Sequence, residues 1–152
     1  MEGSFDMGSY LDKGTKDEVQ ITWKDSLKRA NLSGIQITAP SSDGDKYDYG
    51  NKWESKSGIK LGLTTDELEK LNGKTFSFSG FGWDYGGGVM GWNGGRLDKQ
   101  GVSVTLSEGN SWTTVSEKES ESIMGDQTVK SDNPIVKKLQ PHVVQIMVYK
   151  PE

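Results

Sequence analysis

Few residues in this chain could do acid–base or nucleophilic chemistry. With one His and zero Cys, it excludes thiol nucleophiles, zinc fingers, iron–sulfur clusters and disulfides. The single imidazole, His142, directly follows Pro141 at the expected start of a strand. A Ser-His-Asp arrangement would need this imidazole in a cleft beside an activated Ser. The sequence therefore favours a structural or exposed role for His142.

Asp84 is the strongest candidate for a catalytic carboxylate. It lies between Trp83 and Tyr85, and apolar neighbours can raise the pKa of a carboxyl group. A glycosidase needs a second carboxylate roughly 5–9 Å away, and no other acidic position stands out for that role. We therefore expect Asp84 to be a turn residue and the protein not to be an enzyme, with a carboxylate-dependent hydrolase as an alternative.

Aromatic residues beside glycines form the candidate binding site. Eight of the sixteen residues in the segment 80–95 are Gly, but no G-x-G-x-x-G precedes a helix there, which argues against phosphate binding. Exposed Trp and Tyr rings are frequent anchors for a protein partner and could stack on sugar rings, whereas the alternative places the same rings in the core. The candidate residues are Trp83, Asp84, Tyr85 and Trp92, with Trp53 as a further exposed candidate.

The acidic segment 40–50 is the one place that suggests a cation. It carries Asp43, Asp45 and Asp48. An EF-hand loop needs oxygen ligands at its first, third and fifth positions and Gly at its sixth, whereas here a Gly follows the first Asp directly. The pattern favours a solvated loop without a metal, and binding of a cation by these three carboxylates is left open.

The composition indicates a single small folded domain spanning residues 1–152, because domains run roughly 100–200 residues. Only 32% of the residues are hydrophobic, so the five Trp, five Tyr and four Phe must supply much of the core. The formal net charge of -4 argues against a nucleic-acid partner, which needs clustered Lys and Arg. No run of about 18 apolar residues exists, so we expect no membrane span, and we expect a monomer.

Alternating apolar residues predict strands over residues 19–23 and 34–38, as an antiparallel pair joined by a connector of about ten residues. Asn93-Gly94 is the dipeptide favoured by a tight hairpin turn. We expect a loop over residues 40–50 and a mobile polar loop over residues 107–131, with a weak strand at 112–115. Further strands are expected over residues 75–83, 89–92, 102–106 and 142–150, the last being the most apolar and central.

The most legible segment is a short helix in the middle of the chain. Thr64 followed by Glu67 fits a capping box, and Gly73 fits a left-handed cap. Leu68 and Leu71 share one face of the intervening two turns. A helix this short is not stable alone, so it must lie on a sheet.

Asp132 or Asn133 before Pro134 predicts the start of a second short helix, which Pro141 closes. The expected fold class is therefore α+β, an antiparallel sheet with one or two short helices packed on one face. Residues 1–57 and 58–152 also show a weak echo, for example Ile21-Thr22-Trp23 and Met90-Gly91-Trp92. The echo suggests two three-stranded half-repeats, although chance could produce it in an aromatic-rich chain.

The run 62–73, which reads Gly-Leu-Thr-Thr-Asp-Glu-Leu-Glu-Lys-Leu-Asn-Gly, resembles a known helix–turn signature, G-x-T-x-x-E-(V/L)-x-x-(L/I)-x-G. The signature belongs to SmpA/OmlA-type outer-membrane lipoproteins and to the β-lactamase-inhibitor-protein-like fold. Residues 58–95 are also similar to secreted bacterial proteins or lipoproteins. The chain has one helix before one hairpin, where the tandem form has paired helices. The resemblance implies an α+β layer, an extracytoplasmic location and a non-catalytic, protein-binding role.

Taken together, the residues and the resemblance predict a non-catalytic, extracytoplasmic protein–protein interaction module. Residues 1–5 show no basic, apolar leader, so a place in the periplasm or at the cell surface requires an export segment that this chain does not carry. The alternative is binding of a carbohydrate or small ligand through the Trp and Tyr rings. The expected partner is a protein or a glycan, and no cofactor is expected.

Overall fold

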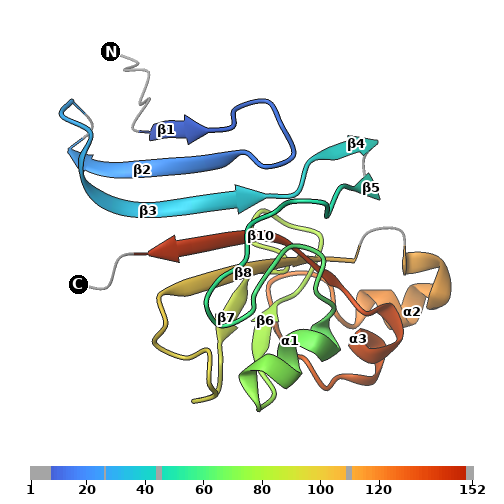
Figure 1. Ribbon diagram of the computed structural model, residues 1–152. Coiled ribbons are helices and arrows are strands. Elements are labelled where there is room, and N and C mark those ends of the chain that lie inside the picture. Colours follow the sequence, from blue (N-terminus) through green and yellow to red (C-terminus); the bar gives the residue numbers. More distant parts are fainter. Residues whose placement is uncertain (1–7, 26, 44–45, 109–110, 150–152) are drawn as a thin grey trace.

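The computed structural model describes residues 8–25, 27–43, 46–108 and 111–149, and it confirms the α+β fold class. The larger antiparallel sheet has the order β1-β2-β3-β10-β8, with strands Gly8–Leu11, Val19–Asp25, Ala30–Thr38, His142–Tyr149 and Val102–Ser107. The smaller one has the order β7-β6-β9, with strands Val89–Gly91, Ser77–Ser79 and Thr128–Lys130. Helices α1 (Thr65–Asn72) and α3 (Pro134–Leu139) lie with the smaller sheet, below the larger one in Figure 1.

The predicted antiparallel pair at the start of the chain is confirmed, but its connector is shorter than expected. Strand β2 continues to Asp25 and β3 begins at Ala30, because polar residues extend the backbone pairing beyond the apolar alternation. Apolar side chains meet directly across four strands of the sheet. Ile21 is opposite Ile35, and Val148 is opposite both Ile35 and Val102. We call these four residues the apolar row.

Strand β10 pairs with β3 on one side and β8 on the other, which confirms its predicted central place. A bulge shifts its register between Val143 and Gln145. Residues 40–50, expected to be loop, contain the short paired strands β4 (Ser41–Asp43) and β5 (Lys46–Tyr47). The half-repeats stay a prediction. Of the described strands in residues 8–57, β1, β2 and β3 lie in the larger sheet and β4 and β5 pair only with each other, whereas the strands of residues 58–149 are divided between the larger and the smaller sheet.

Helix α1 forms as its caps predict. The Thr64 side chain accepts a hydrogen bond from the Glu67 backbone N–H, and the Glu67 side chain accepts one from the Thr64 backbone N–H. At the other end of the helix, Gly73 takes the left-handed conformation with φ of 74°. Leu68 is fully buried and Leu71 packs at the edge of the core. Helix α3 likewise starts at its predicted cap, with the Asn133 side chain accepting from the Ile135 N–H.

Two predictions about the aromatic region are wrong. The strand expected over residues 75–83 is confined to β6, because the chain turns away at Gly82, whose φ is +85°. Asn93 and Gly94 do form a tight turn closed by the Gly95 N–H on the Trp92 carbonyl. That turn joins no paired strands, since the next strand, β8, lies in the other sheet.

The segment 107–131 is more regular than expected. A 3-10 helix at Ser111–Thr114 replaces the weak strand predicted for residues 112–115. Helix α2 (Glu117–Glu121) follows, with a capping box between Ser116 and Glu119, and β9 closes the segment. The capping-box pattern was readable in the sequence, and the highly polar composition obscured it. The predicted mobility of this segment stays a prediction.

The buried polar side chain of Asn72 connects the end of α1 to the turn before β8. Asn72 is only 1% exposed. Its amide donates to the carbonyls of Lys74 and Trp92, both at 2.9 Å, and its oxygen accepts from the Leu97 N–H at 3.2 Å. All three partners are backbone groups of irregular segments. The Asn72 side chain therefore provides the hydrogen bonds that a strand or helix would otherwise provide to these groups.

We predict that Asn72→Ala destabilises the protein by about 2–4 kcal/mol, because it leaves three backbone groups without their partner in a buried place. Urea unfolding followed by circular dichroism measures the loss. Asn133→Ala, which removes a single hydrogen bond at a partly buried helix cap, is the matched comparison and should cost about 1 kcal/mol. Equal losses in the two variants would contradict the role given to Asn72.

Two lysines of α3 hold different acidic partners. The Lys137 ammonium lies 2.5 Å from Asp66 and 3.5 Å from Glu69 of α1, whereas Lys138 pairs with Glu119 of α2. The hydrogen bond from Lys137 lowers the pKa of Asp66 below its usual 3.8. The hydrogen bond from Lys138, with those from Ser116, lowers the pKa of Glu119 to about 2.

We predict that Lys137→Met raises the pKa of Asp66 and leaves that of Glu119 unchanged. Lys138→Met should raise the pKa of Glu119 and leave that of Asp66 unchanged. Carboxyl NMR titration measures both. A carboxylate whose pKa is lowered in the folded state adds stability above its unfolded-state pKa, and this stability is lost as the pH falls through the folded-state value. Lys137→Met removes this contribution of Asp66, so the variant should lose less stability below about pH 4 than the wild type loses. Equal shifts of both carboxylates in either variant would refute the pairing.

Candidate functional site

Two of the predicted aromatic residues form an exposed pair on a surface turn. Trp83 is 38% exposed and Tyr85 is 73% exposed, with their rings edge to face at 5.3 Å between centroids. The Trp83 indole N–H donates to the Gly80 carbonyl at 2.9 Å, which fixes the ring over its own turn. Asp84 is exposed between them, as expected of a turn residue.

Glycine is required where this turn meets β8. The Gly87 N–H donates to the Ser79 carbonyl, and the Gly87 carbonyl accepts from the Leu106 N–H at 2.8 Å. Gly87 has φ of +78°, and a Cβ there would stand 2.0 Å from the Leu106 carbonyl oxygen. The backbone of this turn can therefore approach β8 this closely only because residue 87 is glycine.

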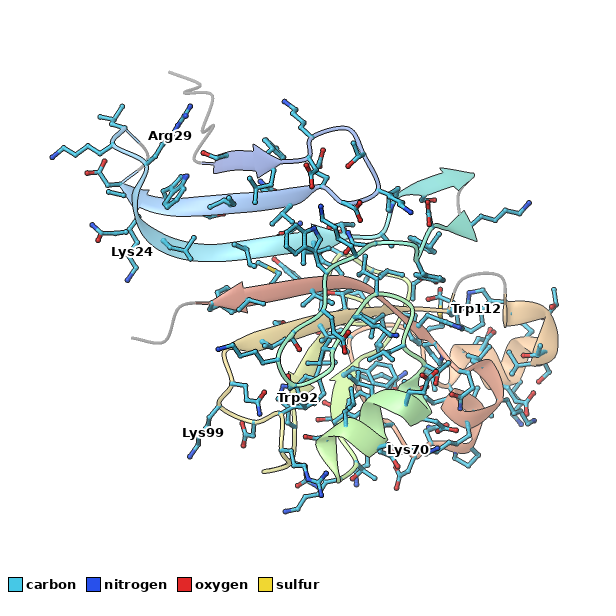
Figure 2. All side chains as sticks on the ribbon, in the orientation of Figure 1. Lys24, Arg29, Lys70, Trp92, Lys99 and Trp112 are labelled. Atoms are coloured by element: carbon cyan, nitrogen blue, oxygen red, sulfur yellow. The ribbon has the colours of Figure 1, made fainter. Side chains whose placement is uncertain are left out.

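Trp92 does not belong to this surface pair. It is 7% exposed and packs against Phe76 at 5.3 Å between ring centroids, and Figure 2 shows it among the side chains below β8. The core needs this ring because aliphatic residues are few. This corrects the placement of Trp92 on a surface platform and agrees with the alternative, core interpretation.

The other predicted chemical groups have structural surroundings. His142 stacks on Tyr49, with 5.6 Å between ring centroids and 13° between the planes. The Asp48 carboxylate accepts from the Gly50 N–H at 2.8 Å and so closes a turn. Asp45 and the side chain of Asp43 lie outside the part of the chain that the structure describes. Within the described ranges, no group of three or more His, Asp or Glu could hold a metal ion.

Trp53 lines a groove of about 640 Å³ on one face of the larger sheet. The floor is apolar and comes from three neighbouring strands, with Ile35, Ile37, Val102, Ile146 and Val148. Three members of the apolar row are in it, and they are only half buried by the protein itself. The residues 53–57 and 59 form one wall, and Lys99 and Gln100, just before β8, form the other.

The wall that carries Trp53 is held from two sides. The Trp53 indole N–H donates to the Asp17 carbonyl at 2.8 Å, and the Asp17 carboxylate accepts from the Lys52 N–H, also at 2.8 Å. On the other side, Ile59 is fully buried, and the Ser55 N–H donates to its carbonyl. Figure 1 shows this connection crossing the front of β10 and β8. These hydrogen bonds hold the wall through contacts within the protein itself.

The predicted residues therefore do not make one site. Trp83, Asp84 and Tyr85 share an exposed turn, Trp92 is in the core, and Trp53 lies at the groove. Sequence reasoning missed the floor of the groove, although its alternating residues were recognised as strands. Alternation tells which residues share a face, but the connection that covers part of that face is a long-range feature.

Comparison of this chain with protein-family models, with curated proteins and with solved structures finds no match. The resemblance to SmpA/OmlA-type lipoproteins and to the β-lactamase-inhibitor-protein-like fold stays a prediction. In the part of the chain that the structure describes, no helix has the length and apolar character needed to cross a membrane.

We predict that Trp92→Ala and Tyr85→Ala separate core from surface. Trp92→Ala should lower the free energy of unfolding by about 3–5 kcal/mol because it opens a cavity beside Phe76. Tyr85→Ala should change it by no more than about 0.5 kcal/mol, since its ring is mostly in solvent. Urea unfolding measures both, and a large loss in Tyr85→Ala would show that the surface pair is structural.

Proposed function

We propose that this protein is a non-catalytic binding module that holds the apolar part of a small ligand in the groove beside Trp53. The observation that carries the proposal is that three members of the apolar row, Ile35, Val102 and Val148, stay half buried on the floor of the groove. Small-ligand sites are clefts of roughly 300–1,000 Å³ lined mainly by apolar side chains with a few polar groups. The groove, at about 640 Å³, matches both the size and the lining.

Burial of the floor supplies the driving force. Apolar surface removed from water contributes roughly 25 cal/mol per Å², and the three floor residues that stay half buried, Ile35, Val102 and Val148, are all aliphatic. The Trp53 ring adds a flat wall, and its indole N–H is already satisfied by Asp17. A ligand therefore meets an apolar surface without having to break a hydrogen bond of Trp53.

A protein partner, which the sequence favoured first, is the second candidate. The exposed Trp83–Tyr85 pair supports it, because such rings are common interface anchors. We also propose an extracytoplasmic location, and this part of the proposal rests only on the resemblance to secreted bacterial proteins and lipoproteins. We place the groove first because it offers a recessed apolar volume of about 640 Å³, whereas the pair offers two exposed rings on a surface turn.

We predict that the neutral fluorescent probe N-phenylnaphthylamine binds the wild-type protein with enhanced emission and that Val148→Glu abolishes the enhancement. The reason is that this variant places a carboxylate in the apolar floor. Fluorescence titration measures binding, and circular dichroism confirms that the variant is folded.

Met147→Glu is the matched control. Met147 is the neighbour of Val148 on the same strand and therefore points to the opposite face of the sheet. It should bind the probe as the wild type does. Absence of binding to the wild type, or equal loss in both variants, would refute the groove as the binding site.

A further inference from the structure

We infer that the ligand of the groove is an amphipathic anion, with one aliphatic chain on the floor and a carboxylate or similar head group at Lys56 and Lys99. This inference rests on the proposed function and adds the chemical class of the ligand. It follows from where charge stands around an otherwise apolar groove.

The charged side chains at the groove are mostly cationic. Lys56, Lys99 and Glu54 are its ionisable lining residues. The Glu54 carboxylate lies beside Gly58, within the wall itself. In a chain with formal net charge of -4, two lysines against one acid are a local reversal of sign. A negative head group is therefore attracted to this rim, and a positive one is repelled.

The two lysines stand on opposite walls. Lys56 is exposed within the turn that the Gly58 N–H closes on the Ser55 carbonyl. Lys99 is exposed on the segment before β8, where Figure 2 shows its side chain extending outward. In the described part of the chain, neither ammonium group makes an ion pair. Each carries a compact charge on a flexible stem, so both can turn towards a head group between the walls.

The floor favours an aliphatic chain over a sugar ring. Its aliphatic residues form two adjacent rows, Ile35 with Val148 and Ile37 with Ile146, that run across β3 and β10. A floor of branched aliphatic side chains offers dispersion contacts along a line, whereas stacking on sugar rings would need exposed aromatic faces. Trp53 is the single aromatic residue of the lining. This argues for an aliphatic chain over a glycan in the groove.

The test compares three ligands that share one chain and differ in head group, namely dodecanoate, dodecanol and dodecyltrimethylammonium, each below its critical micelle concentration. Each displaces N-phenylnaphthylamine from the wild-type protein in a fluorescence competition. We expect dodecanoate to compete at the lowest concentration and the cation at the highest. The advantage of dodecanoate over dodecanol should shrink with added salt, because exposed charges are screened.

The double variant Lys56→Gln/Lys99→Gln should weaken dodecanoate about three- to tenfold and leave dodecanol unchanged, as expected for two exposed ion pairs. Lys24→Gln/Lys70→Gln is the matched control, because it removes the same charge from positions that do not line the groove. Equal competition by dodecanoate and dodecanol would overturn the inference and leave the proposed function standing. Failure of the probe itself to bind the wild type would overturn both.

Discussion

Strand β10 holds this fold together because it pairs along both edges, with β3 on one side and β8 on the other. Its bulge decides which side chains share a face. Val143 is opposite Leu106 before the bulge, and Ile146 is opposite Val104 after it. The extra residue lets Val143 and Ile146, three positions apart, point to the same apolar face. Without it, one of them would turn to the opposite face, and the core and the groove would not be continuous.

The apolar face of β10 contributes to the core at one end of the strand and to the floor of the groove at the other. Near Val143 this face is fully buried, and the residues before α1 pair with the edge of β10, since the Gly62 N–H donates to the Val143 carbonyl and the Val143 N–H to the Leu63 carbonyl. Further along, Val148 stays half buried between Ile35 and Val102. The groove is therefore the place where the core reaches the surface, and its apolar character follows from the continuity of the strands.

Local signals in the sequence predicted local structure well. The caps at Thr64 and Asn133 placed both predicted helices, and Asn93-Gly94 formed a tight turn, although it does not close the expected hairpin. What the sequence left open depended on distant partners: whether Trp92 lies in the core, which its packing against Phe76 decides, and which strand pairs with β8. The site divides in the same way. Trp53 could be recognised as a candidate from the sequence. Its groove, however, forms only where β3, β10 and the crossing connection come together, and a pattern within one segment cannot predict such a long-range arrangement.

The groove owes its shape to contacts made at its outer edge. The Asn51 side chain donates to the Lys16 carbonyl, next to the Asp17 group that holds Trp53. The wall is thereby tied to the turn between β1 and β2, and that turn is built on the same sheet as the floor. Hydrogen bonds thus connect the wall to the sheet that forms the floor, which restricts the positions that the wall can take before a ligand binds. A site formed in advance loses less conformational entropy on binding, which is the condition under which an aliphatic floor of this size can hold a small molecule.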